Sequence, residues 1–439
     1  MSFEPFNGMT PPNEWKARLV KDIAVVNERS IKKSDRIDTI QYIDIAAVNH
    51  RNIDQLQTFK LNDAPSRARR IVQDNDILIS TVRPNLKHYT MIRKAEPDMI
   101  ASTGFAVISP KRVHPDFLYY YLTSDSYTRY LTQIAEGQTS AYPAFNSDII
   151  ENTVIYLPPE NEQCEIGEML ASVDKKIELN NAINKNLEEM TQALFKRWFV
   201  DFEFPNENVE PYKSSGGEFE ESELGLIPKG WKIGRIGDIA SNRTQTVRPE
   251  EIPSGTKYIG LEHIPRKKLA ISHFGVSDEL ESNKLWFYKG DILFGKLRPY
   301  FHKVSIAPFD GVCSTDILSI NSKRDEFYGY LVFQLFSERL VDYVTQSSNG
   351  TKMPRTNWRD MSNYSIVIPP MEIAEKFTTV VRGFVSMMTN NIYENMNLSN
   401  IRDTLLPKLM SGEIRIPVEQ DHSAPYLPMV AERSANYQP

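Results

Sequence analysis

The sequence predicts a mixed α/β unit that occurs twice in tandem, with a long helix after each copy. Three observations predict this arrangement. The second half of the chain repeats residues of the first half in the same order, short β-rich runs alternate with turn signals, and apolar residues after each half recur at steps of three and four. The expected fold class is therefore α/β, of the mixed α+β kind, with a pseudo-two-fold internal repeat.

The internal repeat indicates a domain duplication with a period near 215 residues. The offset between matching residues falls smoothly from 216 to 211, as small deletions in loops would produce. The matching residues include Trp15 and Trp231, Tyr42 and Tyr258, Asp76 and Asp291, Arg83 and Arg298, Ser102 and Ser314, and Pro159 and Pro370. Chance matches would not keep both their order and so even an offset, and a period this long excludes a solenoid.

Each copy begins with a globular part. Short β-rich runs at residues 76–82 and 105–108 are bounded by turn signals, and residues 117–122 predict a helix between strands. Residues 203–224 are rich in Pro, Ser, Gly and Glu, which predicts a linker between the copies. The expected order is a first domain at 1–158, a helical region at 159–202, the linker at 203–224, a second domain at 225–368, a second helical region at 369–412 and a poorly ordered tail at 413–439.

Each helical region spans about 40 residues, on the order of 60 Å as an α-helix, which is too long for one small domain to cover. Steps of three and four are the coiled-coil pattern, so we expect the two helices to pair. Asparagine interrupts the apolar stripe at matching positions, Asn180 and Asn184 in the first copy and Asn391 and Asn395 in the second. Facing asparagines would fix the register of the pair. The alternative is that each helix packs on its own globular half. Pro407 predicts a kink or an early end of the second helix.

Composition limits the class of protein. The 439 residues are 41% hydrophobic and 25% charged, which is ordinary globular usage. No apolar run is long enough to span a membrane, and the first residues do not resemble a signal peptide. With only two cysteines, Cys164 and Cys313, we expect neither a disulfide framework nor a cysteine-based zinc site. A cytoplasmic protein without a bound metal or membrane association is expected.

Two regions of the chain are basic although its net charge is −6. Residues 60–94 hold eight Lys and Arg against three Asp, and residues 257–303 hold nine against five acidic residues. Two basic regions in an acidic chain suit the binding of phosphate groups at two places. Ordinary solvated surfaces would give the same pattern.

Motifs of catalytic and nucleotide-binding sites are absent from the sequence. Residues 290–296 nearly match a P-loop, but Leu297 stands where Ser or Thr must bind magnesium. The patterns of zinc proteases, serine hydrolases and dinucleotide-binding proteins do not occur. The aromatic residue of the amino-methyltransferase signature is missing, since Glu160 and Met371 follow the two Pro-Pro pairs. No catalytic residue is predicted, which favours a binding function.

Two arginines are candidates for binding. Arg83 and Arg298 occupy matching positions after a predicted strand, each directly before a proline that stiffens the turn. Arginine can bind guanine or a phosphate through two hydrogen bonds. Nearby lysines are Lys87, Lys296 and Lys303. The structural alternative is that the arginines pair with Asp76 and Asp291 and hold the turn.

A polar loop that starts at a glycine is the second matched feature, at residues 137–143 and 350–355. Its candidate contact residues are Gln138, Thr139, Ser140, Lys352 and Arg355. Polar loops that differ between two copies are what the separate reading of two sequences requires. A simple surface turn is the alternative.

Several segments resemble the specificity subunits of type I restriction–modification systems. Residues 192–202 (QALFKRWFVDF), followed by Tyr212–Gly217, resemble the central conserved region of that family. Residues 225–231 (GLIPKGW) are similar to the start of its second recognition domain, and residues 405–414 (LLPKLMSGEI) to its distal conserved region. The segments follow the family's order, and the resemblance covers about residues 11–415.

The resemblance implies two target recognition domains, each reading one half of a split, asymmetric site in double-stranded DNA. It implies that the long helices form an antiparallel coiled-coil spacer. It also implies two methyltransferase (M) subunits docked on the conserved helical regions, and restriction (R) subunits in the same complex. S-adenosylmethionine, ATP and Mg would belong to those partners, which methylate adenine N6 and cleave DNA, while this chain would hold no cofactor and catalyse nothing.

Two alternatives remain open from the sequence. The chain could serve as the specificity subunit of a type II-like or another phage-defence methyltransferase. It could also be a coiled-coil scaffold for protein partners with no role at DNA. The partners that co-purify with the chain, and its salt-dependent binding to DNA, would distinguish these cases.

Overall fold

The computed structural model describes residues 11–416, except 33, 34, 36, 50, 54, 55, 139–141 and 349–352. The chain divides into two compact units. Unit 1 comprises residues 1–175 and 399–439, and unit 2 comprises residues 176–398. The expected tail at 413–439 lies outside the described residues from position 417 onward.

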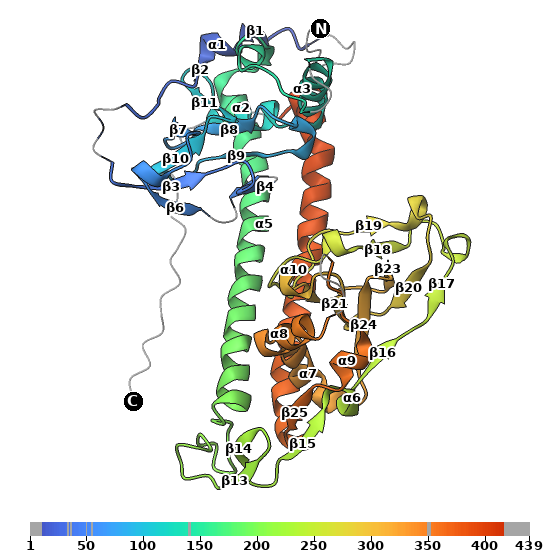
Figure 1. Cartoon of the computed structure of the whole chain (residues 1–439). Helices are drawn as coiled ribbons and strands as arrows, with labels where there is room; N and C mark the ends of the chain where they lie inside the picture. The colour runs from blue at the N-terminus through green and yellow to red at the C-terminus, as the bar shows by residue number, and fades with distance from the viewer. Residues whose placement is uncertain are drawn as a thin grey trace, which may run out of the picture. The chain divides into compact units, whose positions relative to one another are not determined.

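Unit 1 contains two four-stranded sheets (Figure 1). The first has the order β2-β11-β8-β9 and is antiparallel, and the second has the order β6-β3-β10-β7 with a parallel pair between β3 and β10. Two smaller pairs are β1-β12 and β4-β5. The strands are β1 (Lys16–Leu19), β2 (Ala24–Val26), β3 (Thr39–Ile43), β4 (Val48–Asn49), β5 (Asn52–Ile53), β6 (Gln57–Lys60), β7 (Ala68–Ile71), β8 (Ile77–Ser80), β9 (Tyr89–Met91), β10 (Met99–Ser102), β11 (Phe105–Pro110) and β12 (Val154–Leu157). The helices are α1 (Val20–Ile23), α2 (Pro115–Leu122), α3 (Asp125–Gln138) and α4 (Asp148–Glu151), with short 3-10 turns η1 (Leu61–Asp63) and η2 (Pro84–Leu86).

Unit 2 repeats this topology. The sheet β16-β24-β21-β22 matches the first sheet of unit 1, and the sheet β17-β20-β23-β18-β19 matches the second, with a parallel pair between β18 and β23 and one added strand, β17. The pair β15-β25 matches β1-β12. The strands are β13 (Phe219–Ser222), β14 (Gly225–Pro228), β15 (Lys232–Arg235), β16 (Ala240–Arg243), β17 (Thr246–Val247), β18 (Lys257–Ile259), β19 (Gly275–Val276), β20 (Lys284–Phe287), β21 (Ile292–Gly295), β22 (Val304–Ile306), β23 (Gly311–Ser314), β24 (Ile317–Ser322) and β25 (Ser365–Ile368). The helices are α6 (Ile236–Ile239), α7 (Tyr328–Leu335), α8 (Glu338–Gln346) and α9 (Trp358–Ser362), with 3-10 turns η4 (Pro249–Glu251), η5 (Leu261–His263), η6 (Ser277–Glu279), η7 (Pro299–Phe301) and η8 (Asp325–Phe327). The predicted fold class and tandem repeat are confirmed.

One inner strand of each copy, β8 or β21, packs against two hydrophobic cores. All four residues of β8 are buried, and so are all four of β21. In β21, Ile292 and Phe294 face one hydrophobic core, while Leu293 between them faces another. Because successive side chains of a strand point to opposite faces, a continuous apolar run serves both cores.

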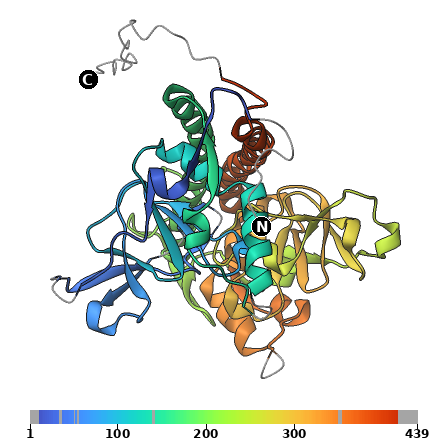
Figure 2. The same ribbon diagram turned by 90° about the horizontal axis from the view of Figure 1, so that it is seen from above.

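Two long helices, α5 (Glu160–Phe195) and α10 (Met371–Met410), each contribute to both units (Figure 1). In unit 2 they pair through asparagines: Asn180 donates to Asn395 at 2.8 Å and Asn391 donates to Asn184 at 2.8 Å. The residue numbers of the partners in α10 fall from 395 to 391 as those in α5 rise from 180 to 184, so the paired segments are antiparallel. In unit 1, where their ends lie side by side (Figure 2), the Arg402 Nη1 atom lies 2.6 Å from the Asp174 Oδ1 atom.

The helices also pack on globular cores, so both interpretations of the apolar stripe hold in part. Ile166 and Leu170 of α5 are buried in the core of unit 1, and Phe377 and Val381 of α10 in that of unit 2. Within unit 2, the buried face of α5 is partly polar. It includes Glu188, Thr191 and the two asparagines Asn180 and Asn184.

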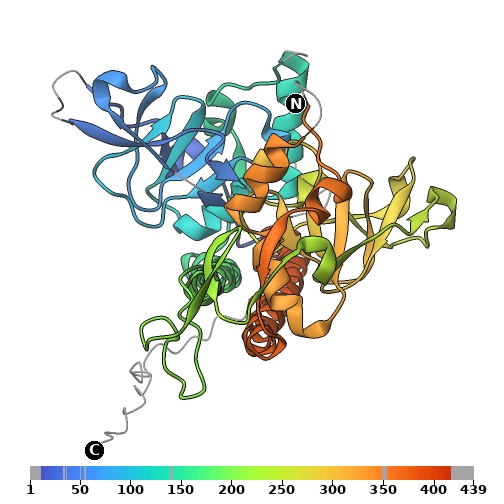
Figure 3. The ribbon, with the colours of Figure 1, turned by 60° about the horizontal axis from the view of Figure 1, so that its bottom comes forward.

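Two expectations for the ends of these helices need correction. Pro407 does not end α10 early, since the helix continues to Met410. A proline this close to the C-terminus removes only one of the last intrahelical hydrogen bonds. The segment at 203–224 is folded: Phe204 stacks on Tyr212 with ring centroids 4.6 Å apart and lies 4.9 Å from Trp231. The boundary expected at 224/225 falls inside the hairpin β13-β14, which follows the π-helical turn η3 (Lys196–Val200) at the end of α5 (Figure 3).

None of the helices among the described residues combines the length and the apolar character needed to cross a membrane.

Candidate nucleic-acid interface

Each unit carries one turn in which two residues other than glycine adopt left-handed backbone angles. We name these the Arg83 turn (residues 83–87) and the Arg298 turn (residues 298–302). Arg83 has φ 48° and ψ 62°, and Arg298 has φ 49° and ψ 65°. The last residues of the turns, Lys87 and His302, have φ 55° and 50°. A left-handed conformation costs roughly 1–2 kcal/mol per residue. The same strained backbone at both sites indicates that the turn has a function beyond connecting two strands.

The ends of the two polar loops lie directly beside these turns. The Arg83 backbone N–H donates to the carbonyl oxygen of Pro143 at 2.8 Å, and the Arg298 N–H donates to that of Pro354 at 2.8 Å. Isolated β-bridges join Val82 to Ala144 and Leu297 to Arg355. The two segments that the sequence singled out separately are therefore one surface feature in each unit.

The structural alternative for the two arginines is wrong. Asp76 is buried and accepts hydrogen bonds from Arg29 Nη2 at 2.6 Å and Ser109 Oγ at 2.6 Å, not from Arg83. Asp291 is equally buried and accepts from Arg243 Nε at 2.7 Å and Ser319 Oγ at 3.0 Å, not from Arg298. Each aspartate also accepts a backbone N–H, from Gln73 and Tyr288. The carboxylates expected to hold the turns are occupied elsewhere.

The guanidinium groups of Arg83 and Arg298 rest on aromatic rings instead. Arg83 lies over the ring of Tyr142, 5.0 Å from its centroid, and Arg298 lies 5.9 Å from that of Phe301. Neither guanidinium forms a hydrogen bond or ion pair with a described residue, and Arg298 Nε is buried without a partner. An aromatic ring positions an arginine without using its N–H donors, so these donors remain available to a ligand.

Positive charge is concentrated around the Arg298 turn. Burial, and then Arg355, lowers the pKa of Lys296, while burial and Arg266 lower that of Lys303. In both cases a neighbouring arginine adds to the effect of burial. Two of these cations already have protein partners, because Arg355 pairs with Asp316 and Lys303 Nζ donates to the Leu261 carbonyl oxygen at 2.5 Å.

In the Arg83 turn the described lysine already has a partner. Lys87 forms an exposed ion pair with Asp125 at 2.7 Å. The predicted contact residues Thr139, Ser140 and Lys352 lie outside the described residues. Gln138 is the last residue of α3, and the placement of its side chain is not described.

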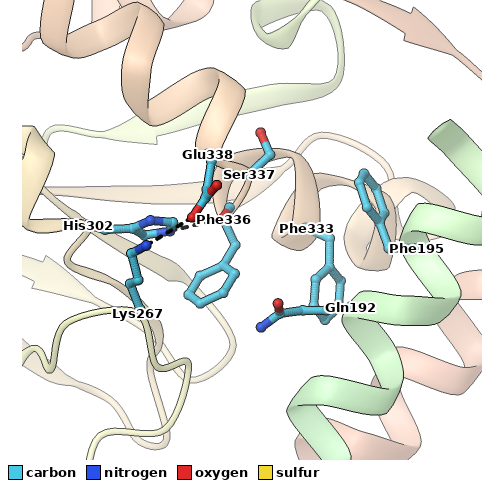
Figure 4. Close-up of a pocket in the computed structure, with 8 residues that line it drawn as sticks. All are labelled: Gln192, Phe195, Lys267, His302, Phe333, Phe336, Ser337 and Glu338. Atoms are coloured by element: carbon cyan, nitrogen blue, oxygen red, sulfur yellow. Dashed lines mark hydrogen bonds and ion pairs between the residues drawn. The ribbon is translucent and has the colours of Figure 1, made fainter. Parts of the chain in front are cut away.

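A cavity in unit 2 does not form a catalytic site (Figure 4). Its volume is about 220 Å³, and it is lined by Gln192, Phe195, Lys267, His302, Phe333, Phe336, Ser337 and Glu338. Serine, histidine and glutamate are the residue types of a nucleophilic triad, but each is engaged elsewhere. A ring nitrogen of His302 lies 2.9 Å from the Phe336 carbonyl oxygen, Glu338 pairs with Lys267 at 2.9 Å, and Ser337 caps α8 by accepting from the Leu340 N–H.

One group of described residues could offer ligands to a metal. His114, Cys164 and Glu168 place one potential ligand atom each within 4.8 Å of one another. The Cys164 thiol donates to Glu168 at 3.2 Å, and burial raises the pKa of that thiol to about 11. In the structure the thiol and the carboxylate of this group bond to each other.

A family model for the "Type I restriction modification DNA specificity domain" matches residues 12–189 and again residues 228–395. The chain belongs to the type I restriction–modification specificity subunits. Members of this family are non-catalytic components of type I restriction enzymes. The two matches coincide with the two copies of the internal repeat.

Known specificity subunits are similar to this chain over nearly its whole length. It is 26% identical over 468 residues to the Type I restriction enzyme HindI specificity subunit of Haemophilus influenzae, covering 92% of this chain and 100% of that protein. It is 26% identical over 427 residues to the MjaIX specificity subunit of Methanocaldococcus jannaschii, covering 92% and 94%. A crystal structure of the S subunit of M. genitalium shares the fold, with a TM-score of 0.54, 13% identity and 91% and 99% of the two chains covered.

The structure adds residues to this candidate interface that sequence reasoning missed. Arg266 is exposed and lies over the ring of Phe301, 3.9 Å from its centroid, so two arginines of the specificity subunit share one ring. The basic composition of residues 257–303 was the only sequence signal for Arg266. Tyr142 is the ring partner of Arg83, and it stood in the polar loop without any signal of its own.

Proposed function

We propose that this chain directs a type I restriction–modification complex to a split, asymmetric site in double-stranded DNA. Unit 1 would read one half of the site and unit 2 the other. Methyltransferase subunits, which would supply S-adenosylmethionine, and restriction subunits, which would supply ATP and Mg, would dock on this chain in the cytoplasm. The observation that carries the proposal is the matched pair of strained turns whose arginine side chains donate no hydrogen bond to any residue that the structure describes.

The chemistry of the turns fits duplex DNA. A guanidinium with free donors can bind the O6 and N7 atoms of guanine, or a phosphate, through two hydrogen bonds. Phosphate contacts from the surrounding lysines would position each unit, and base contacts would specify the sequence. Two separate turns with different neighbours suit an asymmetric site.

Methylome sequencing of a host that expresses the complex tests this proposal directly. The wild-type chain should give one bipartite motif. Arg83→Ala should relax or weaken only one half of the motif, and Arg298→Ala only the other half. Arg18→Ala is the control, because Arg18 is exposed and bonds only the carbonyl oxygen of its neighbour Ala17. Unchanged methylation in both turn variants, or equal loss across both halves, would count against the proposal.

Two docking faces for methyltransferase subunits are supported by exposed apolar residues on the helices. Met169 of α5 and Val380 of α10 are exposed at positions 211 residues apart, and so are Met190 and Ile401. The repeat thus places an apolar side chain at the same exposed positions of both helices, as two copies of one partner would require. Met190→Asp or Ile401→Asp should each reduce the bound methyltransferase from two copies to one in native mass spectrometry. Retention of both copies would argue against these faces.

The helices would act as the spacer between the half-sites, which must be about one helical turn of DNA apart, near 34 Å, or a multiple of it. Deletion of seven residues from α5 and seven from α10 removes one heptad from each and keeps the pairing pattern. The number of unread base pairs in the methylated motif should then fall. An unchanged spacing would refute the spacer role.

A further inference from the structure

A large apolar side chain is exposed next to each turn arginine. Tyr142 is 69% exposed and Met353 is 55% exposed. They are 211 residues apart, the offset that also relates Pro159 to Pro370. Each directly precedes the proline, Pro143 or Pro354, whose carbonyl oxygen accepts from the arginine N–H. The two copies therefore share the position and the apolar character but not the side chain.

Hydrogen bonds tie the backbone that follows each of these residues to its turn. After Pro143, the buried Phe145 donates its N–H to the Thr81 carbonyl oxygen at 3.0 Å. After Pro354, the buried Thr356 donates to the Lys296 carbonyl oxygen at 3.0 Å. An exposed apolar side chain forgoes the favourable free energy of burial, which a ligand can recover.

The turns themselves add apolar surface beside the free arginine donors. Leu86 in the Arg83 turn and Tyr300 in the Arg298 turn are each about half exposed, at 48% and 50%. Each turn thus offers hydrogen-bond donors together with apolar groups. The major groove of DNA offers the groups that complement these: guanine presents hydrogen-bond acceptors and thymine presents a 5-methyl group. The minor groove carries no methyl group.

On the basis of the proposed function, we infer that Tyr142 and Met353 read thymine through its 5-methyl group in the major groove, one in each half-site. Arg83 lies over the Tyr142 ring, so the tyrosine and the arginine approach the bases as one rigid pair. Met353 is flexible and its neighbour Arg298 rests on Phe301 instead, so its reading of thymine is less strict.

Replacement of thymine by uracil removes only the methyl group and tests the inference. The complex of this chain with its methyltransferase subunits is titrated in gel shifts with its target duplex and with duplexes that carry uracil at one thymine position at a time. At one position in each half-site, uracil should weaken binding by wild type about three- to fourfold, the effect of losing one buried methyl group. Tyr142→Ala should lose sensitivity in one half-site and keep it in the other, and Met353→Ala should do the reverse.

Val209→Ala is the matched control, because Val209 is also exposed and lies outside both turns. Melting temperatures equal to that of wild type would show that the variants are folded. The inference is overturned if no uracil position affects wild type, if a half-site contains no thymine, or if the variants keep the full uracil sensitivity. In each of those cases wild type still binds its bipartite duplex, whereas failure to bind it at all would overturn the proposed function itself.

Discussion

The Arg83 turn and the Arg298 turn share one backbone but present different side chains. Both have the same left-handed angles and the same hydrogen bond to a proline carbonyl, and a buried aspartate directly precedes the strand that leads to each turn. At the surface, Arg83 rests on Tyr142, whereas Arg298 shares Phe301 with Arg266. The comparison teaches that the buried framework is common to the copies and that the exposed side chains carry their difference, as two readers of unlike half-sites would require.

The largest expected effect tests the common framework. Asp76→Ala and Asp291→Ala should each lower the free energy of unfolding by about 3 kcal/mol, because each leaves a partly buried arginine and a buried serine without their acceptor. Hydrogen exchange of β8 and β21 measures the loss in each unit. Asp125→Ala, at an exposed carboxylate, is the control. A large loss of stability in one unit and a small loss in the other would show that the two frameworks are not equivalent.

The two halves of α5 differ in how they bury a carboxylate, and pH distinguishes them. Asp174 in unit 1 is paired with Arg51 and Arg402. Glu188 in unit 2 accepts from the Leu269 N–H and from Gln192, and burial raises its pKa to about 7. Lys268 and Glu189 are the other charged groups that act on it.

Because the folded state holds the Glu188 proton more tightly than the unfolded state, this residue should destabilise the protein as pH rises from 4.5 through 7, and the loss should level off above that. The expected loss is about 2–3 kcal/mol. Glu188→Gln should remove this part of the pH dependence in chemical denaturation between pH 5 and 8. An identical pH profile in the variant and in wild type would contradict the expectation.

The seam asparagines should behave as a coupled pair. Asn184→Leu alone should cost about 1 kcal/mol, because it leaves the Asn391 amide without its acceptor between the helices. The double variant Asn184→Leu/Asn391→Leu should recover that loss, since an apolar pair fits a coiled-coil seam. A double-mutant cycle in urea measures the coupling. Additive effects would show that the hydrogen bond contributes nothing to the pairing of α5 with α10.

The smallest expected effect concerns Lys87. Its exposed ion pair with Asp125 should contribute less than about 1 kcal/mol to stability. If Lys87 contacts a phosphate, Lys87→Ala should reduce the slope of log Kd against log salt by about one. Asp125→Ala should leave that slope no smaller than in wild type. An unchanged slope in Lys87→Ala would show that Lys87 does not contact a phosphate and only forms its ion pair with Asp125.

Features with a regular spacing could be predicted from the sequence. The repeat, the strands that contain β8 and β11, the paired helices and the facing of Asn180 and Asn184 toward their partners all follow from constant offsets or helical steps. Arg83 and Arg298 stood out because both copies retain them before a proline.

Features that depend on distant residues could not be predicted. Arg29 reaches Asp76 across 47 residues, and nothing in their spacing marks them as partners. The segment at 203–224 has a linker composition, yet it is folded, and its Phe204 packs on Tyr212 and on the distant Trp231. Arg266 becomes relevant only because the fold places it over Phe301.

The division of the chain into a continuous and a discontinuous unit has a consequence for biosynthesis. Unit 2 is a single stretch, residues 176–398, and all of it is synthesised before the last part of unit 1. Unit 1 needs residues 399–416, where Arg402 reaches Asp174 and Arg415 reaches Glu162. The half of the protein that is translated first is therefore the last to be completed, and a chain released near residue 400 would contain all residues of unit 2 but lack part of unit 1.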